Sequence, residues 1–424
     1  MRFFHDAGRF SRPAGCRVPV FFFAVAFLVT ASRIFATVTF DLDFDPPALL
    51  RPAISSAPEI SALAAVVMDA TTGTVLYSKN SALEVPPASM TKLMTMHLAQ
   101  KAVAEGRASM DEIVPIGIES WAQNQPPHSS LMFLEPGQIV TLGELLTGLA
   151  VPSGNDAAVA VAMRLSGSVE AFAKEMTAEA RLMGLSRTRF TEPSGYSPQN
   201  ITTAEEFAFF AREYIRAHPE SLAAFHSLTE FAYPKASNVR EALRSRPGTI
   251  VQTSPNTLLR TFPGVDGLKT GFIEESGYNI TLTAQREGTR FIAVILGAPS
   301  TADRSRDGST LLSWAFDSFR TVQPRIPQIE PARLWKGREK YASLVPEQGL
   351  EFTAPAGRAG QLWFSVQMDG PLIAPVQQGQ RAGYMVFADE SGELYRAPLV
   401  SATEHRRGNI FVRIWHSIVL LFVR

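Results

Sequence analysis

Residues 86–95, PPASMTKLMT, determine how this chain is interpreted. Two prolines lead into an apolar run with helical spacing, which predicts a helix from about residue 89 to residue 104. Ser89 and Lys92 are three residues apart and would share one face of that helix. A serine hydroxyl becomes a good nucleophile when a neighbouring base takes its proton, and a lysine can do this where its pKa is lowered. Taken alone, the pattern fits an ordinary helix start equally well.

The flanking sequence predicts a domain whose sheet is built from both ends. A hairpin precedes the helix, more helical patterns follow it, and strand patterns return after Gly264. The expected strands are 64–69, 74–78, 265–272, 279–284 and 289–296, and the expected helices are 142–165, 169–183, 204–217 and 305–319. Strands at both ends with helices between them indicate an α+β fold with a mixed helical and antiparallel-sheet core.

The 424 residues are enough for two or three domains. Basic residues precede a short apolar run at 18–30, so we expect a signal peptide over 1–36, cleaved after Ala36 or Ala31. An uncleaved anchor is the alternative. A Pro-, Asp- and Ala-rich linker over 37–60, a main domain over 61–326 and a small β-rich domain over 327–402 follow.

Residues 406–424, RRGNIFVRIWHSIVLLFVR, carry basic and polar residues at three- to four-residue spacing on an otherwise apolar segment. As a helix, this segment has a wide apolar face, and its apolar part is too short for a perpendicular span. We expect it to lie in the surface of an anionic membrane. The alternative is a helix packed on the protein itself.

Two further triplets contain residues suited to catalysis. Ser153-Gly154-Asn155 could supply a second hydroxyl and an amide, although a plain turn or helix cap has the same composition. Lys269-Thr270-Gly271, on a predicted strand, could bind a carboxylate and let an extended peptide pair alongside it. Taken alone, it also fits an exposed lysine on an edge strand.

Composition excludes other classes of function. The formal net charge is zero and no basic stripe is interleaved with aromatics, so no nucleic-acid partner is expected. A single cysteine, Cys16, rules out an intramolecular disulfide. The seven histidines form no His-Glu-x-x-His motif, and no metal or other cofactor is expected.

Together, Ser-x-x-Lys, Ser-Gly-Asn and Lys-Thr-Gly in this order resemble the set shared by penicillin-binding proteins and class A β-lactamases. The chain resembles the low-molecular-mass penicillin-binding proteins, the serine-type D-alanyl-D-alanine carboxypeptidases of the peptidase S11 group, over about residues 60–424. "SSLMFLEPGQIVTLGELLTGLAVPSGNDAAVA" (129–160) and "PLIAPVQQGQRAG" (371–383) contribute to this resemblance. It implies a DD-peptidase/β-lactamase-like catalytic domain, a small all-β domain and a C-terminal amphipathic helix.

The resemblance also implies roles for individual residues. Ser89 would be acylated, with Lys92 as its general base, and Ser153 would pass a proton to the leaving D-alanine. Asn155 would hold the substrate amide and Lys92. Lys269, Thr270 and Gly271 would bind the substrate's terminal carboxylate and strand. The oxyanion hole would be the backbone N–H groups of Ser89 and Phe272, a position where the family often has histidine or another polar residue.

The implied reaction removes the terminal D-alanine from peptidoglycan stem pentapeptides, and β-lactams would acylate the same serine. The implied location is the periplasmic face of the cytoplasmic membrane, with the C-terminal helix as a peripheral anchor. Three alternatives remain: a D,D-endopeptidase of the same group, a β-lactamase, and a non-catalytic penicillin sensor. For a β-lactamase, the best candidate for the deacylating glutamate is Glu192, but Tyr196 stands four residues on, where those enzymes usually carry asparagine.

Overall fold

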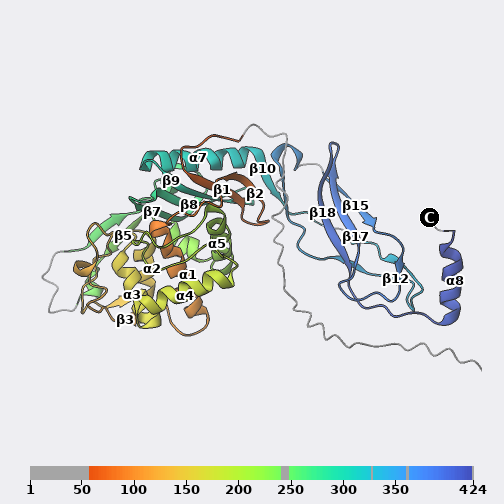
Figure 1. Ribbon diagram of the computed structural model, residues 1–424, viewed down its shortest axis with the longest axis horizontal. Coiled ribbons are helices and arrows are strands. Elements are labelled where there is room, and N and C mark those ends of the chain that lie inside the picture. Colours follow the sequence, from red (N-terminus) through yellow and green to blue (C-terminus); the bar gives the residue numbers. More distant parts are fainter. Residues whose placement is uncertain (1–56, 240–247, 326–327, 360–361, 423–424) are drawn as a thin grey trace, which may run out of the picture. The chain divides into compact units, whose positions relative to one another are not determined.

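The computed structural model describes residues 57–239, 248–325, 328–359 and 362–422. The predicted signal peptide and most of the predicted linker lie outside the described residues. Between residues 57 and 322, helices gather on one side of an antiparallel sheet and a long helix covers the other side (Figure 1).

The central sheet joins the two ends of this domain, as predicted. Its strand order is β2-β1-β9-β8-β7, and every neighbouring pair is antiparallel. Strand β1 is therefore hydrogen-bonded on one side to a strand that follows it immediately, and on the other to a strand more than 200 residues away. The bounds are β1 Ala64–Asp69, β2 Val75–Lys79, β7 Val265–Ile273, β8 Gly277–Arg286 and β9 Thr289–Ala298.

The sheet is buried on both faces. In β1, Val66 and Met68 belong to the helical core, whereas Ala65 and Val67 belong to the core under α7 (Thr301–Ser318). Burial on both faces explains why β1 and β9 are continuous apolar runs without polar alternation.

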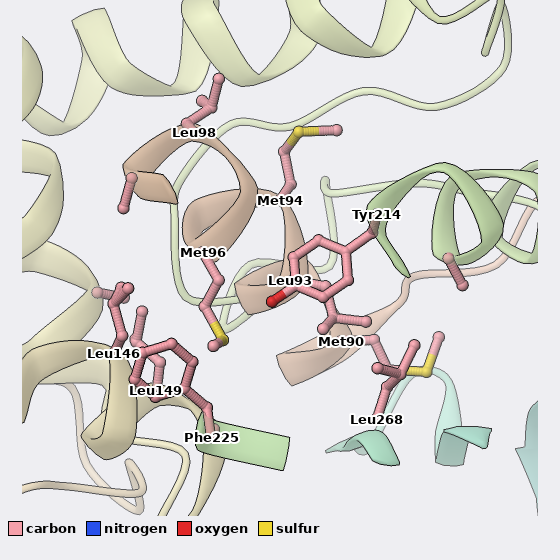
Figure 2. Close-up of a cluster of buried hydrophobic side chains, with 14 of the residues drawn as sticks. Met90, Leu93, Met94, Met96, Leu98, Leu146, Leu149, Tyr214, Phe225 and Leu268 are labelled. Atoms are coloured by element: carbon pink, nitrogen blue, oxygen red, sulfur yellow. The ribbon is translucent and has the colours of Figure 1, made fainter. Parts of the chain in front are cut away.

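Helix α1 (Lys92–Ala104) runs through the middle of the helical side, and ten of its thirteen residues are buried. Met90, Leu93, Met94 and Met96 pack against side chains from several elements, among them Leu146, Tyr214 and Leu268 (Figure 2). A helix enclosed on nearly all sides needs no exposed polar stripe, and even its polar residues Thr95, His97 and Gln100 are buried. The surrounding helices are α2 Leu142–Ala150, α3 Asn155–Ser166, α4 Val169–Leu182 and α5 Ala204–Ala217.

Two helix predictions were wrong in detail. Ser89 lies in a 3-10 turn, Ala88–Thr91, that precedes α1, so it is not in the first turn of the α-helix itself. The expected helix 142–165 is interrupted at residues 151–154, where Pro152 lacks a backbone N–H and Ser153 takes a positive φ of 65°.

The same domain contains smaller elements: strands β3 Ile113–Val114, β4 Val140–Thr141, β5 Glu230–Tyr233 and β6 Ile250–Thr253, helix α6 Leu258–Thr261, and a π-helical turn Leu222–His226.

The C-terminal part is a small all-β domain, as predicted, with its own apolar core that includes Leu334, Met385 and Leu399. Its largest sheet has the order β13-β18-β17-β15, and β10 pairs with β14. A helix, α8 (Ile410–Leu420), follows. None of the helices within the described ranges has the length and apolarity that a membrane span requires. The strands are β10 Phe319–Val322, β11 Ala332–Trp335, β12 Tyr341–Ala342, β13 Leu344–Pro346, β14 Phe352–Pro355, β15 Trp363–Met368, β16 Leu372–Ile373, β17 Arg381–Asp389 and β18 Gly392–Ser401.

Candidate active site

The amine of Lys92 lies at hydrogen-bond distance from the hydroxyl of Ser89, with Nζ 3.0 Å from Oγ. The same Nζ donates to Oδ1 of Asn155 at 2.7 Å and to the carbonyl oxygen of Ser194 at 2.6 Å. A neutral amine has two N–H groups and one lone pair. When the two N–H groups bind Asn155 and Ser194, the lone pair remains for the proton of Ser89, so this geometry suits a general base.

Burial supports this role. Lys92 is fully buried, and burial lowers its pKa to about 7, against the opposing effects of Glu192 and Asp156. A lysine with a pKa near neutrality has a large fraction of free amine at physiological pH. The helix-start alternative does not account for this pair, because the lysine of an ordinary helix start would be exposed to solvent, whereas Lys92 is buried.

The Ser-Gly-Asn triplet lies between α2 and α3, next to Lys92. Asn155 is the first residue of α3, and its side chain binds Lys92 and Oγ of Ser129 and does not cap the helix. Ser153 has a positive φ, and its buried hydroxyl has no hydrogen-bond partner among the described residues. A strained backbone and an unpaired buried hydroxyl are features that cluster at functional sites.

The Lys-Thr-Gly triplet lies on β7, at the edge of the central sheet. Lys269 is only 2% exposed, so the alternative of an exposed edge-strand lysine was wrong. Burial lowers the pKa of Lys269 well below its usual value, and the nearby charges of Lys92 and Arg304 lower it further. Thr270 beside it is also buried.

Gly271 brings this strand against the turn that carries the serine. A Cβ at this position would lie 2.6 Å from the carbonyl oxygen of Pro87 and 3.1 Å from the backbone nitrogen of Ser89. Only glycine allows this approach without movement of the backbone. The next residue, Phe272, is half exposed, and its ring packs at a tilt against that of Tyr278 with ring centroids 4.4 Å apart.

Arg304 near the start of α7 was missed by the sequence reasoning. It is buried, its Nε has no partner among the described residues, and Nη2 donates to the carbonyl oxygen of Pro255 at 3.3 Å. Its charge acts on the nearby Lys269, and an anion bound between these two buried side chains would favour the charged form of both. Helical spacing could have indicated it, because Arg304, Gly308 and Leu311 share the buried face of α7.

Asp156 was missed as well. Its carboxylate is buried and accepts hydrogen bonds from the backbone N–H groups of Met132, Leu134 and Ala157. It thereby fixes the loop that presents Ser129 to Asn155. Desolvation raises its pKa, although the backbone donors oppose this shift.

The sequence profile of peptidase S11, described as D-alanyl-D-alanine carboxypeptidase, matches residues 52–300. The profile of the C-terminal domain of penicillin-binding protein 5 matches residues 324–407. The chain therefore belongs to the peptidase S11 family of D-alanyl-D-alanine carboxypeptidases, with the C-terminal domain found in penicillin-binding protein 5.

One relative is D-alanyl-D-alanine carboxypeptidase DacC of Escherichia coli K12, which is 31% identical over 89% of this chain and 93% of its own length. The structure resembles that of penicillin-binding protein 5 from Haemophilus influenzae, with a TM-score of 0.73, 29% identity, and coverage of 83% of this chain and all of the other.

Two further comparisons are with an endopeptidase and with a structure that contains a β-lactam. A D-alanyl-D-alanine endopeptidase of Pseudomonas aeruginosa is 28% identical over 66% of this chain and 85% of its own length. A cefotaxime-bound structure of penicillin-binding protein D2 from Listeria monocytogenes has a TM-score of 0.53 and 29% identity, and covers 62% of this chain and all of the other.

Proposed function

We propose that Ser89 is the nucleophile of a D,D-carboxypeptidase that removes the terminal D-alanine from peptidoglycan stem pentapeptides. This proposal rests on the three contacts of the Lys92 amine. It donates hydrogen bonds to Asn155 and Ser194, and it lies 3.0 Å from Oγ of Ser89. A peptide that ends in D-Ala-D-Ala supplies both an amide to be attacked and a free carboxylate.

Acylation begins when Lys92 takes the hydroxyl proton of Ser89 and the oxygen attacks the penultimate carbonyl carbon. The C–N bond breaks and Ser153 gives its hydroxyl proton to the leaving amine of D-alanine. The proton that Lys92 took from Ser89 passes to Ser153, so Ser153 is again a hydroxyl and Lys92 again a free amine. The backbone N–H groups of Ser89 and Phe272 would stabilise the oxyanion, which the contact of Gly271 with the serine turn supports. Water then hydrolyses the ester, frees the shortened peptide and restores the hydroxyl of Ser89.

Lys269 and Thr270 would hold the terminal carboxylate. The buried Arg304 guanidinium would attract the entering carboxylate, and the carboxylate would in turn favour the protonated amine of Lys269. Asn155 would bind the substrate amide through its side chain. β-lactams carry a comparable carboxylate and a reactive amide, so they would acylate Ser89 as well.

We further propose that the mature chain begins at Thr37, acts in the periplasm and is held on the inner membrane by α8. The helix supports this location because its apolar residues are exposed, among them Phe411, Trp415 and Ile418. Deletion of 406–424 is expected to release the protein to the soluble fraction with its activity on small substrates intact. Membrane retention of the truncated protein would contradict this part of the proposal.

The test of the activity is release of free D-alanine from a peptide that ends in D-Ala-D-Ala, with the chain from Thr37 and its Ser89→Ala variant. Release by the parent and none by the variant would support the carboxypeptidase. No release by the parent, with Ser89 still labelled by penicillin, would favour the endopeptidase or the sensor.

A further inference from the structure

The carboxylate of Glu192 is the centre of a compact loop, residues 191–200. It accepts hydrogen bonds from the backbone N–H groups of Ser194 at 2.7 Å, Gly195 at 2.6 Å and Ser197 at 3.4 Å. The hydroxyl of Ser194 donates to it at 2.5 Å, and Nδ2 of Asn200 donates at 2.8 Å. Five donors therefore converge on one carboxylate, which has about four lone-pair positions.

This loop packs directly on the segment that carries the nucleophile. Oγ1 of Thr95 donates to the carbonyl oxygen of Pro193 at 2.7 Å. A Cβ at Gly195 would lie 1.8 Å from the carbonyl oxygen of Ala88, so the two backbones are in close contact. The loop also supplies the Ser194 carbonyl oxygen that accepts from Lys92. The conformation of the loop therefore determines where the Ser194 carbonyl oxygen meets the Lys92 amine.

The bonding of Glu192 argues against a role in activating water. A general base needs a free lone pair directed at the water. Both carboxylate oxygens of Glu192 are occupied by donors from its own loop. The residue that the β-lactamase alternative would use for deacylation is therefore already engaged by its own loop.

Three charged groups act on Lys92 from the elements packed around it. Glu192 comes from the loop and Asp156 from α3, and both favour the protonated amine; Lys269 on β7 lies close enough for the two lysine charges to repel. Asp156 is bound to the backbone of residues 132–134, whereas Glu192 shapes the loop that contacts Lys92 itself.

We propose that Glu192 is a positioning residue for the general base: it folds residues 191–200 so that the carbonyl of Ser194 directs the Lys92 amine at Ser89. This inference rests on the roles proposed above for Ser89 and Lys92. The carboxylate acts through the loop and touches no reacting atom. Its negative charge also raises the pKa of Lys92, so it links the shape of the loop to the protonation of the base.

The experiment measures the second-order rate of acylation by a fluorescent penicillin between pH 5 and 9, for the parent chain, Glu192→Gln and Glu192→Asp. Glu275→Gln, an exposed acid in the turn between β7 and β8, is the matched control for loss of one charge. The thermal midpoint of each variant is recorded alongside, and labelling of the parent that disappears in Ser89→Ala tests the proposed function separately.

For Glu192→Gln, we expect the plateau rate to fall on the order of tenfold to a hundredfold, and the acidic limb of the profile to move to lower pH. Glu192→Asp keeps the negative charge, but its shorter side chain cannot reach the same donors. Its plateau rate should therefore fall, while the acidic limb of its pH profile stays near that of the parent. Glu275→Gln should behave as the parent. A parent-like profile for Glu192→Gln, or a loss of rate that tracks the thermal midpoint with no movement of the limb, would overturn the inference.

Discussion

Nζ of Lys92 donates a 2.7 Å hydrogen bond to Oδ1 of Asn155, although the two residues are 63 positions apart in the sequence. The bond joins α1 to the start of α3 and gives the buried amine a neutral partner. A carboxylate in the same place would keep the amine protonated, whereas the amide leaves its pKa near neutrality. The amide of Asn155 therefore favours the free amine that the proposed role of Lys92 as general base requires.

The rate of Ser89 acylation should rise with pH through about 7, because the base acts only as the free amine and the pKa of Lys92 is lowered to about 7. Asn155→Asp would place a negative charge beside the amine and raise the pKa of Lys92. The limb of the variant should then move to higher pH, with acylation reduced at neutrality and partly regained in alkali. A pH–rate profile with labelled penicillin measures both, and an unmoved limb in Asn155→Asp would argue against Lys92 as the base.

Gly271→Ala should reduce acylation on the order of a hundredfold, because its Cβ would lie 2.6 Å from the carbonyl oxygen of Pro87 and force the turn with Ser89 away from β7. Gly357→Ala is the control, since a Cβ there meets no atom within 4 Å. Acylation rates and thermal midpoints of both variants check the prediction. Equal rates in the two variants would show that the close contact is not required.

Arg304→Gln should raise KM for a D-Ala-D-Ala peptide by roughly tenfold to a hundredfold with a smaller effect on kcat, if the buried guanidinium helps to bind the terminal carboxylate. Arg306→Gln on the same helix is a matched control, because that side chain is largely exposed and pairs with Asp303. Steady-state kinetics separates the two constants. A fall in kcat alone would point to a role in the chemical step.

His226 and Tyr214 link helix α1 to strand β7, which carries Lys-Thr-Gly. Its Nδ1 lies 3.2 Å from the carbonyl oxygen of Leu268 and its Nε2 lies 2.8 Å from the hydroxyl of Tyr214, which accepts from Gln100 of α1. Burial lowers its pKa to about 3, so the ring is neutral at working pH. A neutral ring with Nδ1–H donating to Leu268 leaves Nε2 to accept from Tyr214.

His226→Phe would leave both the Leu268 carbonyl and the Tyr214 hydroxyl without their partner, at a cost of roughly 2–4 kcal/mol in the free energy of unfolding. Because Lys269 follows Leu268 directly, KM should rise as well. Tyr214→Phe, which removes a hydroxyl but keeps the bond to Leu268, should destabilise the protein with little change in KM. Urea unfolding and steady-state kinetics of the two variants test this. An equal rise of KM in both would contradict the prediction that only the bond to Leu268 affects substrate binding.

The motif residues could be singled out in the sequence because their side-chain types suit the chemistry proposed above. Ser89, Lys92, Asn155 and Lys269 are close enough to share hydrogen bonds or electrostatic effects, and the sheet joins both ends of the domain as the strand patterns indicate. The carbonyl of Ser194 could not be found in this way, because any residue type supplies a backbone carbonyl. The loop around Glu192 depends on contacts between close neighbours, and sequence patterns do not reveal which donors a carboxylate accepts.

The strand order β2-β1-β9-β8-β7 has a consequence for the order in which the protein is made. When a ribosome has completed Ser89 and Lys92, β1 can pair only with β2, and its other edge waits for β9 at residues 289–298. A nascent or truncated chain that ends before residue 265 contains the serine but lacks Lys269, Gly271 and three of the five strands. Such a fragment has no assembled catalytic centre, so the hydrolytic activity arises only after about seven tenths of the polypeptide has been synthesised.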